Sequence, residues 1–340
     1  MLAVVGATVI AACGSAPAPA SPSVAGSTPT QGSASSAASV AATADPSIAP
    51  QTPEASPAWA VVRATTLATS LPTGLSRAVA MVVGGRIFVC GGFASTGSTT
   101  EAILAFDPGT GALTLVGSLA VPVHDAAGVA LRAAALIFGG GNTTPVSVVQ
   151  RIDASALASI VGDLPSARAD LGAVSIGDSA FVIGGGVSGA LDRAVLVTED
   201  GIHFRPLAEL IVGVRYAAVA ESGGLIYVIG GVGAAGDIAD IQRIDPGSGR
   251  VDLIGQMPRP ISHAGAIVIG GRLLVIGGSS AGQAQDAIWQ VNLGTGATRV
   301  VGRLPQPVSD VATAVIAGTG YVIGGETDTQ IASIVSIVVE

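Results

Sequence analysis

The stretch LPSARADLGAVSIGDSAFVIGG, residues Leu164–Gly185, decides the fold. It predicts a turn, an apolar strand, a tight Gly-Asp turn, a second apolar strand and a closing glycine pair. The same pattern occurs six times, and its closing glycine pairs begin at Gly91, Gly139, Gly184, Gly230, Gly277 and Gly324. These pairs follow one another at intervals of 45 to 48 residues. Such a period is typical of propellers and solenoids, so the sequence predicts six copies of one unit.

Each unit continues with two further strands. The first strand, for example 78–83, is rich in small and branched apolar residues, which predicts a strand covered on both faces. Glycine in the following turn supplies the positive φ of a tight hairpin. The glycine pair after the second strand predicts close packing of backbone against backbone near a crowded centre. A third strand, a turn such as Asp107-Pro-Gly and a fourth strand complete a four-stranded antiparallel sheet, which is a propeller blade.

The last unit lacks a fourth strand. Its third strand, Ile334–Val339, is followed by the last residue of the sequence, whereas Arg63–Ala68 precedes the first unit and has no blade of its own. Pairing of these two segments would cover both exposed edges and close the ring. The predicted fold is therefore an all-β, six-bladed β-propeller of four-stranded blades that occupies residues 58–340.

Three features that recur in phase resemble kelch repeats. They are the hairpins GGLIYVIGG at Gly223 and GTGYVIGG at Gly318, the turn D-P-x-[ST]-G, and the period of about 47 residues. The resemblance covers all six units. It implies that the first strand of each blade lines a central channel and that the residues before it face a funnel-shaped mouth. The arginine expected 16 residues before each glycine pair is present only as Arg168, and the fourth strands carry Leu, Val or Ile in place of the aromatic residue.

The N-terminal segment predicts attachment to a membrane. Cys13 lies in VIAACGS after an apolar run that begins at Leu2, and this resembles a bacterial lipobox with Cys13 as the lipid acceptor. Residues 1–13 would form the signal segment, and the Ala/Ser/Pro-rich residues 14–57 would form a flexible tether to an extracytoplasmic domain. The alternative is an alanine-rich stretch with an incidental cysteine. Cys90 lies inside a predicted strand and is expected to be a small buried apolar residue.

Composition excludes several partners. The formal net charge is -8, and the 15 basic residues are all Arg without a cluster, so nucleic acids and anionic lipid headgroups are not expected as partners. Glycines and Pro145 interrupt the longest uncharged run, so no membrane-spanning helix is expected and the membrane would be reached only through the lipid anchor. We expect a monomer without cofactor or metal, since no loop has the spacing of a calcium site.

The candidate site follows from the kelch resemblance. The position two residues after Arg168 and its equivalents is polar in every unit and would face the mouth: Arg77, Asp125, Asp170, Tyr216, His263 and Asp310. Neighbouring polar residues are His124, Arg168, Arg215, Arg259, Ser262 and Ser309. In a ring of six, Asp125 would face His263, Asp170 would face Asp310, and Arg77 would lie between Asp310 and Asp125. Polar groups that converge on a concave surface are typical of a small-molecule site.

Three interpretations of this mouth remain open. It can be a solvated network of ion pairs alone. It can bind a ligand, either a protein or a neutral or anionic carbohydrate: the carboxylates would accept hydroxyl hydrogens, Tyr216 or His263 would stack on the sugar, and Arg77, Arg168 or Arg215 would bind a carboxylate.

The third interpretation is an enzyme. The kelch resemblance includes two known enzymes, a sialic acid mutarotase and galactose oxidase. The six-bladed bacterial mutarotase is the more similar of the two, and it would use His263 and either Asp125 or Asp310 as general acid and base. A copper site like that of galactose oxidase is excluded, since Tyr227 and Tyr321 lie inside strands. Rim side chains that pair with one another would favour binding or the ion-pair network; an unpaired His263 beside a deep pocket would favour catalysis.

Overall fold

The computed structural model describes residues 49, 51–52, 57–187 and 189–340. All of these lie in Val40–Glu340, one of the two units into which the chain divides. Cys13 and most of the predicted tether 14–57 lie outside the described residues. Every regular element of the described residues is a β-strand, and this part of the chain contains no helix of the length and apolarity needed to cross a bilayer.

The first three repeat units each form a four-stranded antiparallel sheet. Sheet 1 consists of β3 (Val79–Val83), β4 (Arg86–Cys90), β7 (Ala102–Asp107) and β8 (Ala112–Ser118). Sheet 2 consists of β9 (Ala127–Leu131), β10 (Ala134–Phe138), β11 (Val148–Ile152) and β12 (Ala158–Asp163). Sheet 3 consists of β13 (Gly172–Ile176), β14 (Ser179–Ile183), β17 (Ala194–Thr198) and β18 (Arg205–Glu209).

The last three units repeat this order. Sheet 4 consists of β19 (Ala218–Ser222), β20 (Leu225–Ile229), β23 (Asp240–Asp245) and β24 (Arg250–Gln256). Sheet 5 consists of β25 (Gly265–Ile269), β26 (Arg272–Ile276), β28 (Gln283–Val291) and β29 (Thr298–Val308). Sheet 6 consists of β30 (Ala312–Ile316), β31 (Thr319–Ile323), β32 (Ser333–Val339) and β1 (Val62–Ser70).

Short strands extend the connections that follow the glycine pairs, and β2, which precedes β3, joins the first of these ladders by pairing with β5. They pair as small antiparallel ladders, and the second strand of the last ladder is the start of β28. These short strands are β2 (Leu75–Ser76), β5 (Phe93–Ala94), β6 (Ser98–Thr99), β15 (Gly186–Val187), β16 (Ala190–Leu191), β21 (Val232–Gly233), β22 (Gly236–Asp237) and β27 (Ser279–Ser280).

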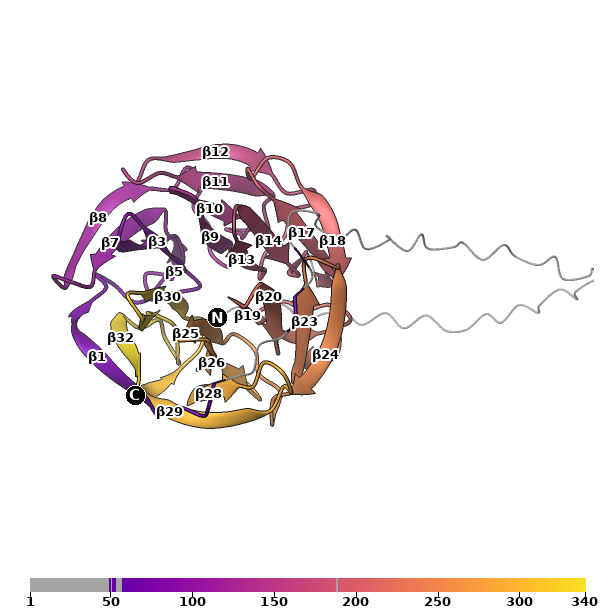
Figure 1. Ribbon diagram of the computed structural model, residues 1–340. Coiled ribbons are helices and arrows are strands. Elements are labelled where there is room, and N and C mark those ends of the chain that lie inside the picture. Colours follow the sequence, from indigo (N-terminus) through magenta and orange to yellow (C-terminus); the bar gives the residue numbers. More distant parts are fainter. Residues whose placement is uncertain (1–48, 50, 53–56, 188) are drawn as a thin grey trace, which may run out of the picture. The chain divides into compact units, whose positions relative to one another are not determined.

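Apolar side chains join each sheet to the next in a cycle. Among the described residues, the hydrophobic clusters lie between sheets 1 and 2, 2 and 3, 3 and 4, 4 and 5, 5 and 6, and 6 and 1. Phe88, Phe138 and Tyr227 are fully buried in three of these clusters. In Figure 1 the colours run once around the centre and bring yellow β30 next to indigo β3. Each sheet therefore buries both of its faces against two neighbours.

Sheet 6 joins the two ends of the described chain. β1 pairs antiparallel with β32 from Val62 opposite Val339 to Thr66 opposite Val335. Arg63 also forms an ion pair with Glu340, and the Glu340 amide donates to the Val61 carbonyl at 2.9 Å. The predicted pairing of 63–68 with 334–339 is confirmed. With β1, sheet 6 has four strands in the same order as the other sheets.

The glycine pairs hold adjacent sheets together. The amide of each second glycine donates to a carbonyl in the segment that leads into the next sheet, at 2.8 to 3.0 Å. These bonds are Gly92 to Val123, Gly140 to Arg168, Gly185 to Val214, Gly231 to Ile261, Gly278 to Val308 and Gly325 to Leu75. A Cβ on each first glycine would lie within 2.6 Å of the same carbonyl oxygen. The predicted close backbone packing is confirmed, and its partner is the entry to the next sheet.

The first strands are covered on both faces, as the sequence predicts, but less deeply on one of them. β3, β9, β19 and β25 alternate between buried and half-buried residues, and half-buried ones such as Ala80 and Val82 still pack against a neighbouring cluster. The half-buried side chains line a channel of about 300 Å³ formed by all six first strands. Most of these residues are Ala, Val or Gly, and the only charged one is Glu221. Small side chains suit this position because six converging strands leave little room between them.

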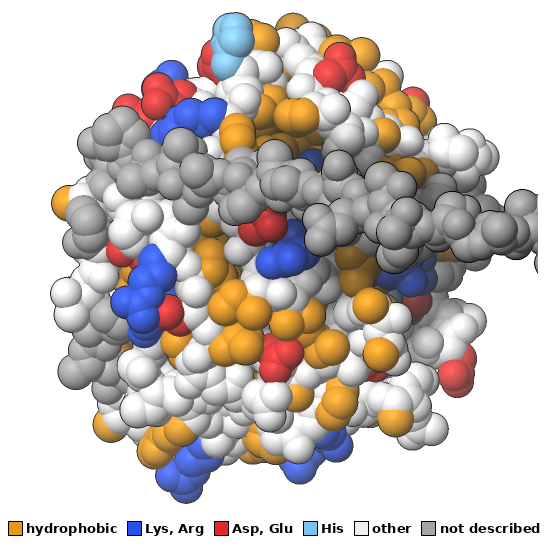
Figure 2. All heavy atoms as spheres, turned by 90° about the vertical axis from the view of Figure 1, so that its right-hand side faces the viewer, with side chains coloured by type: hydrophobic (Ala, Val, Ile, Leu, Met, Phe, Trp, Pro, Cys, Tyr) orange, Lys and Arg blue, Asp and Glu red, His pale blue; other side chains and the backbone are white. Residues whose placement is uncertain are grey.

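The outer strands carry exposed apolar residues at one repeated position. Leu115, Ile160, Leu253 and Val300 each precede a Val-Gly or Ile-Gly pair in the fourth strand and are exposed. The register between the third and fourth strands shifts next to them in each of these sheets. Such bulges twist the edge and hinder pairing with another chain. Figure 2 shows the side where β18 and β24 lie, with apolar side chains among charged ones.

Two glycine substitutions test the contact between sheets. Gly230 and Gly223 have similar φ values, 61° and 63°, but a Cβ on Gly230 would lie 2.1 Å from the Ile261 carbonyl oxygen, whereas a Cβ on Gly223 would meet nothing within 4 Å. We expect Gly223→Ala to cost about 1 to 2 kcal/mol of unfolding free energy through its backbone conformation. Gly230→Ala is expected to cost at least about 2 kcal/mol more, because the backbone of sheet 5 must move. Equal urea midpoints for the two variants would contradict this account of the glycine pairs.

Candidate functional site

The six predicted mouth residues form a closed ring of backbone hydrogen bonds, here called the rim ring. Each amide donates to the carbonyl of the preceding member: Asp125 to Arg77, Asp170 to Asp125, Tyr216 to Asp170, His263 to Tyr216, Asp310 to His263 and Arg77 to Asp310, at 2.8 to 3.1 Å. All six residues have a positive φ, between 53° and 61°. The predicted cyclic order is therefore present, and Arg77 lies between Asp310 and Asp125.

The backbone of the rim ring is strained. A left-handed conformation costs a non-glycine residue about 1 to 2 kcal/mol, and asparagine, aspartate and histidine tolerate it better than Arg or Tyr. Glycine would relieve the strain, yet every member carries a polar side chain. Together with the residue after each of them, these side chains line a hollow of about 120 Å³. Strained backbone conformations of this kind are found preferentially at functional sites.

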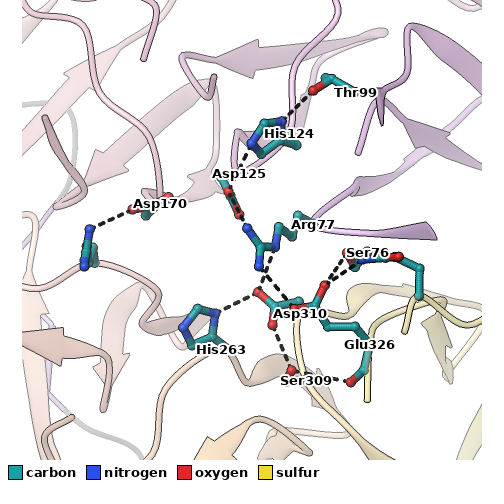
Figure 3. A network of polar contacts seen from close by, with 12 residues as sticks. Ser76, Arg77, Thr99, His124, Asp125, Asp170, His263, Ser309, Asp310 and Glu326 are labelled. Carbon is teal, nitrogen blue, oxygen red and sulfur yellow. Dashed lines mark hydrogen bonds and ion pairs between the residues drawn. The ribbon is translucent and has the colours of Figure 1, made fainter. Parts of the chain in front are cut away.

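Arg77 is the centre of the polar network (Figure 3). Its guanidinium forms ion pairs with Asp125 at 3.5 Å, Asp310 at 3.7 Å and Glu326 at 3.1 Å. Burial by itself lowers the pKa of Arg77, but these three carboxylates raise it above its ordinary value. The guanidinium therefore stays charged, although its Nε atom is buried and makes no hydrogen bond.

Asp125 is the carboxylate most affected by burial. Its side chain is only 8% exposed, it forms an ion pair with Arg77, and His124 Nε2 lies 3.6 Å from its Oδ2 atom. Burial raises the pKa of Asp125 to about 7, and Arg77 opposes that shift. Asp125 therefore changes its charge near neutral pH. Burial and then Arg77 lower the pKa of His124, whose Nδ1 lies 2.8 Å from Thr99 Oγ1.

The other side of the rim ring contains an aromatic pair. The His263 and Tyr216 rings stack with centroids 3.9 Å apart, and His263 Nδ1 lies 2.7 Å from Asp310 Oδ1. The Tyr216 hydroxyl hydrogen-bonds to Asp170, whose pKa is raised, chiefly by burial. Arg215 adds an ion pair to Asp170 at 3.6 Å and lies over the Tyr216 ring. The two aromatic rings thus stack on each other within the protein.

The remaining predicted residues lie in different places. Arg215 and His124 border the rim ring, and Ser309 donates to Asp310 Oδ2 at 2.8 Å. Ser262 is buried and forms a backbone bridge with Ser279. Arg259 is exposed and does not line the hollow.

Arg168 is not brought to the hollow either. Its buried guanidinium pairs with Asp192 at 2.7 Å and donates to the Gly184 carbonyl at 3.3 Å and to Ser166 Oγ at 3.1 Å. All of these contacts lie within sheet 3 and its connections. Arg168 therefore fixes the loop that enters this sheet, and Nε of its side chain makes no hydrogen bond.

Sequence reasoning missed the residues that follow the glycine pairs. Glu326 comes directly after Gly324-Gly325, forms a backbone bridge with Ser309, and accepts from Ser76 Oγ at 2.7 Å. Phe93 occupies the equivalent place in sheet 1 and contacts the His124 ring edge to face. The available signal was the fixed distance of these positions from the glycine pair. It was weak because the six equivalent residues differ widely in type.

The site has no arrangement for a metal ion. Across the described residues, no group of three or more His, Cys, Asp and Glu side chains could hold one. Cys90 is also poorly suited to bind a metal ion. It is buried in sheet 1, as predicted, and burial raises the pKa of its thiol. The chemistry available at the mouth is hydrogen bonding and charge pairing by Arg, Asp, His and Tyr.

Two comparisons at the level of sequence give no match for this chain. No protein-family model matches it, and no curated protein matches its sequence. The repeat pattern, the sheets and the rim ring are therefore the observations from which a function can be inferred.

A comparison of glycine and alanine at one rim position tests the strain. Both Asp170→Gly and Asp170→Ala remove the same carboxylate, but only glycine adopts the φ of 61° without cost. We expect the glycine variant to be more stable than the alanine variant by about 1 kcal/mol. At Asp163, which lies in strand β12, the order is expected to reverse, because glycine weakens extended strands by about 0.5 to 1 kcal/mol. Chemical denaturation of the four variants measures both differences; alanine at least as stable as glycine at position 170 would contradict the strain.

Proposed function

We propose that the domain is a six-bladed β-propeller of the kelch type that binds a carbohydrate at its rim ring. The repeat of about 47 residues, the cyclic packing of the six sheets and the pairing of β1 with β32 support the architecture. The lipobox-like Cys13 supports an extracytoplasmic domain attached to the membrane by a lipid. The proposed function is based on the mouth. A few polar groups that converge on a concave surface are typical of a site that binds a small molecule such as a sugar.

One observation carries the proposal. Six residues keep polar side chains in a backbone conformation that glycine would adopt at lower cost, and all six side chains border one hollow. Other non-glycine residues, such as Ala156 and Ala317, also have a positive φ away from the hollow, so the convergence of six polar side chains is what distinguishes the mouth. The rim ring also satisfies its own backbone amides, so a ligand is recognised by side chains, chiefly carboxylates that accept hydroxyl hydrogens.

The pairing of the rim side chains favours binding over catalysis. His263 is hydrogen-bonded to Asp310 and stacked on Tyr216, and the hollow of about 120 Å³ is small. A mutarotase-like enzyme needs an acid and a base free to reach a sugar. The observation that favours this alternative is Asp125, whose pKa of about 7 suits proton transfer.

Titration calorimetry against a panel of mono- and oligosaccharides tests the proposal. We expect a ligand whose affinity falls about tenfold or more in Asp170→Asn, because a hydrogen bond to a charged group is lost. Asp178→Asn is the matched control: Asp178 also pairs with an arginine, Arg132, but on the exposed surface. Its affinity is expected to be unchanged.

Two results would count against binding at the mouth. They are no heat with any saccharide, and equal affinity for Asp170→Asn and the parent protein. Faster equilibration of sialic acid anomers in the presence of the protein, followed by proton NMR, would favour the mutarotase instead.

A further inference from the structure

The channel between the six first strands is a second hollow of the domain. It has a volume of about 300 Å³ and is lined by the central residues of these strands, whereas the hollow at the rim ring is lined by residues that precede them. The two hollows share no lining residue. Occupancy of the channel is therefore independent of carbohydrate binding at the rim ring.

The wall of the channel is apolar. Ala, Val, Ile, Met and Gly supply most of it, and among the described residues that line it only Ser175, Glu221 and Thr313 are polar. The Thr313 hydroxyl already has a partner, because it donates to the Ala266 carbonyl at 3.1 Å. A cavity with so few polar groups holds water poorly and accepts apolar molecules.

Glu221 is the exception on this wall. It is the fourth residue of β19, and within the described part of the chain its carboxylate forms no ion pair. A charge beside an apolar surface is costly when no opposite charge pairs with it. The fourth residues of the other first strands are all uncharged: Val82, Ala130, Ser175, Val268 and Val315.

The adjacent hairpin turn does not explain the glutamate. Glu221 Oε1 accepts from the Gly224 amide at 2.8 Å. Yet the turns Gly84–Gly85 and Gly270–Gly271 have φ values of 57° and 77° and of 56° and 72°, close to the 63° and 77° of Gly223–Gly224, and they form without a carboxylate at the equivalent position. The turn also uses only one of the two carboxylate oxygens, so the second is free to bind another group.

We infer that the channel binds the alkyl chain of a primary amine whose ammonium group pairs with Glu221. Glu221 lies next to the hairpin turn, at the end of the channel away from the rim residue Tyr216, which precedes β19. From there the chain extends along the apolar wall toward the rim ring. Alkyl ammonium groups are charged at neutral pH, as that of lysine is, and an ion pair beside an apolar wall is stronger than one in water.

The volume of the channel limits the length of the chain. A water molecule occupies about 30 Å³ in the liquid, and a methylene group is of similar size, so a channel of about 300 Å³ has room for a chain of roughly six to ten carbons. Each methylene buried there is expected to tighten binding about threefold to fourfold.

A lysine side chain of another protein carries the same ammonium group. Its other end is joined to a backbone, which is too wide to enter between the six strands. Lysine would therefore pair with Glu221 from outside and leave the apolar wall beyond Glu221 uncovered. The extent of that wall favours a free amine.

Titration of the full chain at pH 7, followed by NMR of the added compound, tests the inference. Affinity is expected to rise from butylamine to hexylamine to octylamine. Hexylamine is expected to bind at least about tenfold more tightly than hexanol, because only the amine forms a charged contact, and hexanoate is expected to bind least. Nα-acetyl-lysinamide, which stands for a lysine side chain, is expected to bind more weakly than hexylamine.

Three variants locate the site. Glu221→Gln keeps an acceptor for the Gly224 amide and is expected to lower the affinity for hexylamine to that for hexanol. Glu101→Gln is the matched control, since Glu101 is also without an ion pair in the described part of the chain but is exposed, and it is expected to change nothing. Ser175→Leu fills the channel and is expected to weaken hexylamine and hexanol alike by at least about tenfold. Circular dichroism checks that the variants fold.

Several results would overturn the inference. They are no binding of the amines, hexanol or hexanoate bound as tightly as hexylamine, Nα-acetyl-lysinamide bound more tightly than hexylamine, and an unaltered affinity for hexylamine in Glu221→Gln. If Ser175→Leu fails to fold, the series of compounds and Glu221→Gln still decide. All of these results leave the proposed carbohydrate site untouched, because it lies in the other hollow.

Discussion

The structure depends on the contact between each glycine pair and the backbone that enters the next sheet. A carbonyl there accepts from the second glycine amide, at 2.8 Å for Gly325 and Leu75, and it approaches the first glycine so closely that a Cβ would not fit. This contact fixes the spacing between neighbouring sheets at the end where the first strands begin. The apolar clusters between the sheets then fill the space that the spacing sets. The last of these contacts joins sheet 6 to the segment before sheet 1. A displacement at any one of the six contacts would therefore strain the other five.

The rim ring is a consequence of this convergence. The chain must turn sharply between the carbonyl bound by a glycine and the first strand, and it does so through one left-handed residue. Six such turns meet and satisfy one another's backbone groups. The polar side chains at these positions are therefore held by a rigid frame. Asp125 is almost fully buried there because its neighbours crowd it, and the same crowding leaves Arg77 with three carboxylates and one unpaired N–H.

Sequence periodicity predicted most of the fold. The glycine pairs, the hairpin turns and the unpaired segments at the two ends located the sheets, and β1 and β32 are the two segments that were expected to pair. The six rim residues were also found, because one position is polar in every repeat. The side-chain partners could not be predicted: Glu326, Thr99 and Phe93 lie in connections whose sequences vary from repeat to repeat. Arg168 matched the repeat in spacing, but its partner Asp192 stands at a connection position that holds other residue types in other repeats, such as Ile238 in sheet 4.

Sheet 6, built from both ends of the described chain, is expected to be as firmly closed as the other sheets. Native-state hydrogen exchange of the β1 and β32 amides tests it most directly, with the β23 amides of sheet 4 as the reference. The amides that are hydrogen-bonded within these strands are expected to exchange only through global unfolding, with the same free energy of opening and the same dependence on denaturant. Exchange of the β1 and β32 amides about 100-fold faster than that of β23, as expected for a pair that opens locally, would contradict it.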